Sequence, residues 1–207
     1  MGTSFPVGSF GGHPVQSKPR WIPLSLRVMS AQGLHFERLD RALHEARFLE
    51  FAAEFRDLGE GGFDRLDMLF SDPDGYFDLA LRFEHDRDLP DKWVPMSHYL
   101  FFESDRLVGG SRLRRRLSPV LHLDGGHIGY EVRPSARRRG YATEILRQTL
   151  EEARRIGIPK ALLTVATTNH PSLRVVEKNG GVFDRETVSP RSGETMRRYW
   201  IDTAWRR

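Results

Sequence analysis

The feature that most constrains the fold of this chain is the stretch Gly126–Leu146, where an apolar, strand-like run leads through a basic loop into an amphipathic helix. The run breaks at Pro134-Ser135, and residues 137–142 then read Arg-Arg-Arg-Gly-Tyr-Ala. Backbone N–H groups in the first turn of a helix have no intrahelical partner, and the helix dipole favours negative charge there. The stretch therefore predicts a strand, a loop and a helix N-terminus that together hold a pyrophosphate.

The composition of the chain narrows the chemistry that it can perform. Its 207 residues, 39% hydrophobic and 29% charged, are ordinary for one soluble domain. The absence of cysteine excludes disulfides, thiolate zinc sites and cysteine nucleophiles. The net charge of +4 and the pI near 9.7 suit a phosphorylated ligand, and more weakly a nucleic acid.

The first part of the chain reads differently from the rest. Residues 1–23 are rich in Gly, Ser and Pro, and they lack the charged start and apolar core of a signal peptide. We expect a flexible N-terminal tail over residues 1–23 and a single domain over residues 24–207. No segment approaches the roughly 18 uninterrupted apolar residues of a membrane span, so we expect no membrane partner. A cytoplasmic location fits these features.

The remaining sequence alternates between strand and helix patterns. Apolar, β-branched and aromatic runs predict strands at Leu24–Met29, Ser97–Ser104, Arg106–Arg115, His127–Arg133, Lys160–Ala166, Val182–Val188 and Met196–Thr203. Apolar residues at helical spacing predict helices at Arg38–Leu58, Phe77–Glu84, Arg139–Ile156 and Pro171–Asn179. Turn residues predict loops at Asp57–Gly75 and Leu117–Gly126, and a bulge or bend at Gly109-Gly110. This order predicts an α/β fold with helices on the faces of a mixed sheet.

A second motif follows the expected strand at Lys160–Ala166. It reads Asn169-x-x-Ser172 and continues into Glu177-Lys178-x-Gly180. Together with Arg137-x-x-Gly140-x-Ala142, it resembles the Gcn5-related N-acetyltransferases (GNAT). That family carries Arg/Gln-x-x-Gly-x-Gly/Ala at the start of the helix after its fourth strand. Its ribosomal-protein and related branch carries Asn-x-x-Ser…Glu-Lys-x-Gly.

The resemblance covers roughly Val94–Trp200, and Gly126–Thr143 is particularly similar to acetyltransferases of this superfamily with no assigned substrate. It implies a GNAT-like mixed, mostly antiparallel sheet, splayed between strands 4 and 5, with helices on both faces. It also implies acetyl-CoA as co-substrate, with the pyrophosphate at the basic loop and the pantetheine arm along the fourth strand. The implied cofactor-binding residues are Glu131, Val132, Arg133, Arg137, Arg138, Arg139, Gly140, Tyr141, Ala142, Thr143, Asn169, Ser172 and Lys178.

The reaction that the resemblance implies is direct attack of an amine on the thioester, with a strand N–H such as that of Val132 stabilising the oxyanion. Many relatives place a tyrosine acid where this chain has Val176. Some place a glutamate base where it has Thr164. The proton chemistry of this chain therefore departs from the better-known pattern.

Two residues are the expected catalytic groups. Ser172 is the best remaining acid, because a serine at this place in the similar branch can reach the CoA sulfur. Glu131 is the expected base, with Glu103, His98 and His127 as alternatives. No base is needed if the amine arrives neutral through water.

Three classes of function remain open. The first is an acetyl-CoA-dependent N-acetyltransferase acting on a primary amine of a small-molecule or peptide acceptor. The second is a catalytically silent CoA-binding sensor or scaffold, and the third is a basic RNA- or ribosome-associated protein. The acidic residues of the first helix and the loop after it indicate either a cationic acceptor or a solvated face; they are Glu50, Glu54, Asp57, Glu60 and Asp64.

Other partners are expected only weakly or not at all. No metal is expected, because the histidines show no metal-ligand spacing. Nucleic acid is not the expected partner, since Arg112 and Arg114–Arg116 fit a solvent-facing or substrate-entry patch better. A homodimer remains one of the open possibilities. Asn169 fits a helix cap or a contact to the CoA arm. The aromatic residues that we expect only to pack the sheet are Tyr130, Tyr199 and Trp200.

Overall fold

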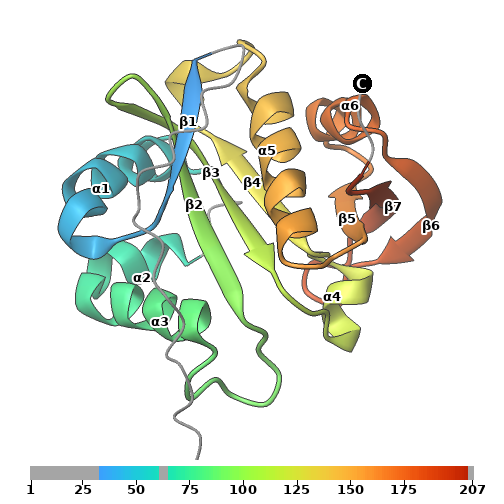
Figure 1. The fold of residues 1–207 in the computed structure, drawn as a ribbon, viewed down its shortest axis with the longest axis horizontal. Helices are drawn as coiled ribbons and strands as arrows, with labels where there is room; N and C mark the ends of the chain where they lie inside the picture. Colours follow the sequence, from blue (N-terminus) through green and yellow to red (C-terminus); the bar gives the residue numbers. More distant parts are fainter. Residues whose placement is uncertain (1–32, 61–64, 205–207) are drawn as a thin grey trace, which may run out of the picture.

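The computed structural model describes residues 33–60 and 65–204, which form two antiparallel sheets with helices on their faces (Figure 1). The first sheet has the strand order β1-β2-β3-β4, with bounds Leu34–Arg38, Met96–Glu103, Arg106–Arg114 and Ile128–Val132. The second has the order β5-β7-β6; β5 is Lys160–Ala166, β7 is Thr195–Asp202 and β6 is Val182–Val188. The expected tail at residues 1–23 and the expected strand at residues 24–29 lie outside the described residues.

The helices lie on opposite faces of the first sheet. On one face are α1, α2 and α3, which span Arg41–Asp57, Leu66–Ser71 and Pro73–His85 (Figure 1). On the other is α5, Tyr141–Arg155, and α6, His170–Lys178, lies beside α5 against the second sheet. A short helix α4, Pro119–Leu123, and a 3₁₀ turn η1, Pro134–Ala136, flank β4. The expected α/β fold with helices on both faces is confirmed.

The central strand β2 shows how two cores are built on one sheet. Successive side chains of a strand point to opposite faces. Leu100 and Phe102 therefore pack against α1, α2 and α3, whereas Tyr99 and Phe101 pack in the core beneath α5. Because both faces of β2 are covered, its sequence is a continuous apolar run rather than an alternating one.

The neighbouring strand β3 carries the expected bulge. Phe101 lies opposite Gly109 and Phe102 lies opposite Leu107, so Val108 has no partner on β2. A Cβ atom on Gly109 would lie 2.4 Å from Ile145 Cδ1 and 2.8 Å from the main-chain oxygen of Glu131. Glycine at this position therefore lets helix α5 and strand β4 approach the bulge closely.

The two sheets meet at one end of β4 and β5. The His127 N–H donates to the Leu162 carbonyl at 2.7 Å, and the Leu162 N–H donates to His127 Nδ1 at 2.9 Å. Beside them, the Gly125 N–H donates to Thr164 Oγ1 at 2.7 Å. Beyond these contacts, the described residues of β4 and β5 form no ladder. The expected splay between the fourth and fifth strands is confirmed, and a gap opens from His127 toward Val132.

Three short elements differ from the sequence prediction. Helix α2 lies in the expected loop 57–75, helix α4 lies in the expected loop 117–126, and β1 ends where a helix was expected to begin. The two helices have six and five residues, which is too short to show helical periodicity in the sequence. For α4 a start signal was present: Ser118 Oγ accepts the Leu121 N–H, and Pro119 occupies the first turn.

Candidate active site

The basic loop after β4 forms a turn suited to an anion. Arg138 and Gly140 have φ angles of 64° and 85°, and α5 begins directly afterwards at Tyr141. Left-handed residues among right-handed ones bring successive N–H groups to one side, as in anion-binding nests. Within the described part of the chain, the backbone N–H groups of residues 138–142 donate to no backbone or side-chain acceptor. We name residues 137–143 the phosphate loop.

The three arginines of the phosphate loop are not equivalent. Arg137 forms a bidentate ion pair with Glu60, in which Nη1 lies 2.8 Å from Oε1 and Nη2 also donates to Oε2. Arg139 reaches Glu103 at 3.2 Å. Arg138 is exposed, and no carboxylate among the described residues pairs with it. Arg138 therefore carries the one cation of this run that is not already neutralised within the described residues.

A buried ion cluster ties the start of the phosphate loop to α1. Arg133 is only 7% exposed; its guanidinium donates to Glu50 Oε1 at 2.6 Å, to Glu54 and to the Leu107 carbonyl. The Ser135 N–H donates to Glu54 Oε2 at 3.0 Å. Burial favours a higher pKa for Glu54, but the hydrogen bonds from Ser135 and Arg133 outweigh it and hold that pKa below its usual value.

This cluster changes the interpretation of the acidic residues on α1. Glu50 and Glu54 form ion pairs with Arg133, and Glu60 forms one with Arg137, so their charges are compensated within the molecule. Hydrogen bonding to Arg137 lowers the pKa of Glu60 despite some opposing desolvation. The fifth carboxylate of the set, Asp64, lies outside the described residues.

Helix α6 presents Ser172 toward β4. Asn169 caps the helix, with its Oδ1 accepting the Ser172 N–H at 3.1 Å. The Ser172 Oγ lies 2.7 Å from the hydroxyl of Tyr130, the central residue of β4. Burial raises the pKa of Tyr130 to about 12, although the Ser172 contact opposes this. Tyr130 was expected only to pack, and no local pattern relates two residues that are 42 positions apart.

The second expected catalytic residue, Glu131, faces the other way. Its neighbours Tyr130 and Val132 pack against the core beneath α5, so the Glu131 side chain lies on the opposite face of β4. Glu131 Oε2 accepts from Arg112 at 2.7 Å, with the two side chains 12% and 10% exposed. A Cβ on Gly110 would lie 2.5 Å from Glu131 Oε1, so a glycine there leaves room for the carboxylate.

The other base candidates have different contacts. His127 Nδ1 already accepts the Leu162 N–H; burial, with smaller contributions from His122 and Arg114, lowers the pKa of His127 to about 4. The imidazole is therefore neutral, and it joins the two sheets. Glu103 accepts from Arg139 and from the Tyr141 hydroxyl. His98 lies opposite Arg112, on the same face of the sheet as Glu131.

The two positions at which relatives place acid and base groups are structural here. Val176 is 0% exposed and lies in the core beneath α5. The Thr164 hydroxyl accepts the Gly125 N–H at the vertex of the gap. The Val176 side chain has no exchangeable proton and the Thr164 hydroxyl is engaged by Gly125, whereas Ser172 and its partner Tyr130 offer hydroxyl groups from α6 and β4.

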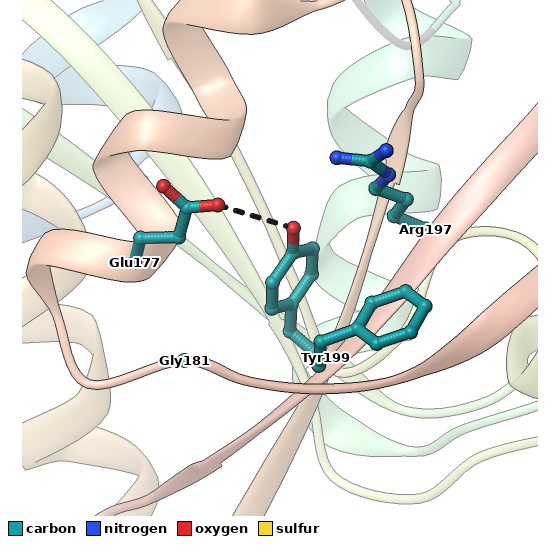
Figure 2. A pocket seen from close by; sticks show the side chains of 5 residues that line it. Glu177, Gly181, Arg197 and Tyr199 are labelled. Atoms are coloured by element: carbon teal, nitrogen blue, oxygen red, sulfur yellow. Dashed lines mark hydrogen bonds between the residues drawn. The ribbon is translucent and has the colours of Figure 1, made fainter.

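A separate cavity of about 400 Å³ lies on the side of α6 that carries Glu177, away from Ser172. It is lined by Glu177, Gly181, Phe183, Arg197 and Tyr199 (Figure 2). The Tyr199 hydroxyl donates to Glu177 Oε1 at 3.3 Å. Glu177 follows Ser172 by five residues, which is about 140° around a helix. None of the expected donor-site residues lines this cavity.

The fold and the phosphate loop agree with comparisons to known proteins. The profile of the acetyltransferase (GNAT) family matches residues 64–181, more than half of the 207-residue chain. The chain belongs to this family, and the predicted membership in a family of acyltransferases is confirmed. A comparison with curated proteins finds no match.

Solved structures show the same fold at low sequence identity. RimL, a ribosomal L7/L12 alpha-N-protein acetyltransferase in complex with coenzyme A, is 14% identical with a TM-score of 0.63, covering 87% of this chain and 97% of that one. The microcin C7 self-immunity acetyltransferase MccE, in complex with acetyl-CoA and AMP, is 9% identical with a TM-score of 0.65 and coverages of 86% and 98%. The ribosomal-protein-S5-alanine acetyltransferase from Vibrio fischeri is 12% identical with a TM-score of 0.63 and coverages of 84% and 96%.

Residues 33–60 and 65–204 hold no group of three or more His, Asp or Glu side chains placed to bind a metal ion. No helix in the same ranges is long and apolar enough to cross a membrane.

Proposed function

We propose that this protein is an acetyl-CoA-dependent N-acetyltransferase that moves an acetyl group to a primary amine of a small-molecule or peptide acceptor. The observation that carries the proposal is the gap between β4 and β5, which runs from His127 toward a phosphate loop with free N–H groups. A pantetheine arm fits such a gap as an added strand, with its pyrophosphate at the helix N-terminus. The proposal takes residues 24–207 as one domain acting in the cytoplasm.

The phosphate loop would hold the charged half of the donor. Backbone N–H groups of residues 138–142 would bind the pyrophosphate, and Gly140 would allow the close approach of the main chain. Arg138 would add its unpaired charge to the phosphates of CoA, and the exposed Lys178 and Asn169 at the two ends of α6 would flank the arm. Arg137 and Arg139, already paired with Glu60 and Glu103, would mainly shape the loop.

The main chain of β4 would orient the thioester. The Arg133 N–H donates to the Val108 carbonyl of β3, so N–H groups of alternate residues, including that of Glu131, point toward β3. The Val132 N–H then points into the gap, where it can donate to the oxyanion that forms on the thioester carbonyl. In well-studied acyl transfer, one such hydrogen-bond donor lowers the activation barrier by about 3 kcal/mol.

The reaction needs no covalent enzyme intermediate. The amine nitrogen attacks the thioester carbon, the new N–C bond forms, and the C–S bond breaks with its electron pair on sulfur. Ser172 would donate a hydrogen bond to that sulfur. The proton that the amine loses would pass to water or to Glu131, which lies on the face of β4 opposite the Tyr130 side chain.

Two observations bear on the alternative functions. Val176 and Thr164 are engaged in packing and in a structural hydrogen bond, which leaves a silent CoA-binding sensor as the second candidate. Three arginines at the end of β3 and just after it form ion pairs: Arg112 with Glu131, Arg115 with Glu84, and Arg116 with Asp86. This engagement weighs against a nucleic-acid surface, because its charges are already compensated.

Two measurements test the proposal. Isothermal titration with acetyl-CoA should give micromolar or tighter binding, and the absence of binding would overturn both CoA-dependent functions. Thiol release should then be followed over small amines, polyamines, aminoglycosides and N-terminal peptides. The chain has no cysteine, so every thiol detected comes from CoA. Binding without turnover on any acceptor class would favour the silent sensor.

A Ser172→Ala variant separates turnover from binding. Loss of one hydrogen bond to a developing thiolate should lower kcat about tenfold while leaving the KM for acetyl-CoA within about twofold. Equal kcat in the variant and the parent would remove Ser172 from the leaving-group role.

A further inference from the structure

The side chains of Tyr130 and Ser172 form a hydrogen bond that joins β4 to α6. Its O–O distance of 2.7 Å is the usual length of a hydroxyl–hydroxyl bond. Tyr130 is the residue before Glu131 on β4, and Ser172 is in the first turn of α6. The pair therefore joins the strand that would orient the thioester to the helix that would meet the leaving sulfur.

The direction of this hydrogen bond follows from the chemistry of the two groups. Because burial raises the pKa of Tyr130 to about 12, its phenol keeps its proton throughout the physiological range. A phenol is a stronger donor than an aliphatic alcohol, so Tyr130 donates and Ser172 Oγ accepts. Within residues 33–60 and 65–204, the other acceptor of the Tyr130 hydroxyl is the Ser172 carbonyl at 3.4 Å, which is long for such a bond.

An accepting Ser172 Oγ must point its own proton elsewhere. The Ser172 main-chain N–H is held by Asn169 Oδ1, so the residue is fixed at both its backbone and its side chain. Leu173 and Val176 anchor the same helix in the core, which limits its movement. The Ser172 hydroxyl proton is then left to point away from Tyr130, toward the gap.

We propose that Tyr130 is a positioning residue that aims the Ser172 hydroxyl proton at the CoA sulfur. This inference rests on the proposed function, because it needs CoA in the gap between β4 and β5. During transfer the C–S bond breaks, its electron pair stays on sulfur, and Ser172 donates a hydrogen bond to the resulting thiolate. Neither hydroxyl loses its proton; the amine's proton leaves by water or Glu131, so Tyr130 acts only through Ser172.

The sharpest test measures the thiol of bound CoA and needs no acceptor. The thiolate absorbs in the ultraviolet, and the chain contributes no thiol because it has no cysteine. A pH titration of the protein–CoA complex should give a lower thiol pKa in the parent protein than in Tyr130→Phe, by about one unit, since one directed hydrogen bond to the thiolate is lost. Identical thiol pKa values in the two proteins would overturn the proposal.

A double-mutant cycle shows whether Tyr130 acts through Ser172. Ser172→Ala should raise the bound-thiol pKa by a similar amount, and adding Tyr130→Phe should then change it by less than about 0.3 units. An equally large effect of Tyr130→Phe in the Ser172→Ala background would mean that the tyrosine acts independently of the serine, and the proposal would fail.

Tyr199→Phe is a matched control. Like Tyr130, Tyr199 reaches α6 from a strand through its hydroxyl, but its partner is Glu177 on the far side of the helix. Its removal should leave the bound-thiol pKa unchanged; a shift equal to that of Tyr130→Phe would indicate a general loosening of α6 and contradict a positioning role. If CoA does not bind the parent protein at all, the proposed function itself fails. If CoA binds but its thiol pKa is the same in the parent and in Tyr130→Phe, only the positioning role of Tyr130 fails.

A second readout uses hydroxylamine as a small neutral amine and follows acetohydroxamate with acetyl-CoA as donor. Tyr130→Phe should lower kcat about tenfold with the KM for acetyl-CoA within about twofold. A change confined to KM would contradict the proposal, because a residue that only shapes the binding gap alters affinity rather than leaving-group departure.

Discussion

The two faces of the first sheet are built in different ways. Beneath α5 lies the proposed donor side, where the phosphate loop, a splayed strand pair and the Tyr130–Ser172 contact depend on backbone geometry and a few fixed side chains. Beneath α1, α2 and α3 lies a core of aromatic rings, in which Phe48, Phe51 and Phe77 pack against β2. The proposed donor side can therefore be recognised in the sequence by short motifs, whereas the opposite side shows only an apolar composition.

The two faces are not independent, because Arg133 and Arg137 of the donor side are held by carboxylates of α1 and the loop after it. The shape of the proposed donor site therefore depends on a part of the chain that carries no recognisable motif. Substitutions on the two faces should expose this dependence, and removal of the buried cation at Arg133 should have the greatest consequence.

Arg133→Met should have the largest effect on stability. The substitution leaves the partly buried Glu54 carboxylate without its cationic partner. Such a loss typically lowers the free energy of unfolding by about 3 kcal/mol. Urea denaturation measures this change. Arg116→Met is the control, since its ion pair with Asp86 is exposed and should contribute less than about 0.5 kcal/mol. Equal effects of the two variants would show that α1 does not anchor the loop.

Gly140→Val should lower acetyl-CoA affinity at least about 100-fold while the fold stays intact. The side chain would sit at a φ of 85° where the main chain would meet the pyrophosphate. Gly157→Val is matched, because Gly157 has a φ of 84° at the other end of α5 with no atom near its missing Cβ. Titration calorimetry compares the two; similar losses of affinity would trace the effect to helix strain and not to the ligand.

Acidification should weaken the junction of the two sheets. The pKa of His127 is about 4 in the folded protein and 6.5 in the unfolded chain, so the unfolded chain binds more protons between these values. The His127 contribution to the free energy of unfolding is complete above pH 6.5 and is lost as the pH falls toward 4, by about 3 kcal/mol.

His127→Gln should flatten the pH dependence of unfolding between pH 6.5 and 4. Below that range, the lowered pKa values of Glu54 and Glu60 should add a further loss in both proteins as these carboxylates protonate. Denaturation at a series of pH values separates the two effects. A parent protein with constant stability from pH 6.5 to 4 would contradict the neutral, bonded state of His127.

Arg138→Gln should have the smallest effect, a loss of acetyl-CoA affinity of about fivefold that shrinks at high salt. Arg138 is the phosphate-loop arginine that no described carboxylate neutralises. The control is Arg154→Gln at the opposite end of α5, which removes the same charge far from the loop. If the two variants bind acetyl-CoA equally well, the loop attracts the donor through its main chain alone.

The sequence predicted the parts of the site that depend on local patterns. The strand Lys160–Ala166 was predicted with its observed bounds, and the helix predicted from Arg139 begins close by, at Tyr141. Asn169 was expected to cap α6, and its Oδ1 accepts the Ser172 N–H. Each of these depends on residues within one turn or one strand.

What the sequence could not predict depends on residues far apart in the chain. Ser135 and Glu54 are 81 positions apart, and Tyr130 and Ser172 are 42 apart, yet both pairs form hydrogen bonds. A single sequence contains no spacing rule for such contacts, because they follow from how β4 lies against α1 and α6. The same limit explains why Tyr130 was assigned only to packing.

The unpaired residue of β3 has a consequence for how this sheet can change in length. Leu107 belongs to the core beneath α1, and Val108 belongs to the core beneath α5. Gly109 also lies against α5, through Ile145, so the two sides are no longer strictly alternating at this point. Deleting Val108 would bring Leu107 and Gly109 together on opposite faces, so β3 would alternate regularly with neither half turned over. The bulge is thus the place where β3 can lose one residue and keep both sets of side chains on their faces, whereas the loss of one residue from its regular part would invert a half-strand.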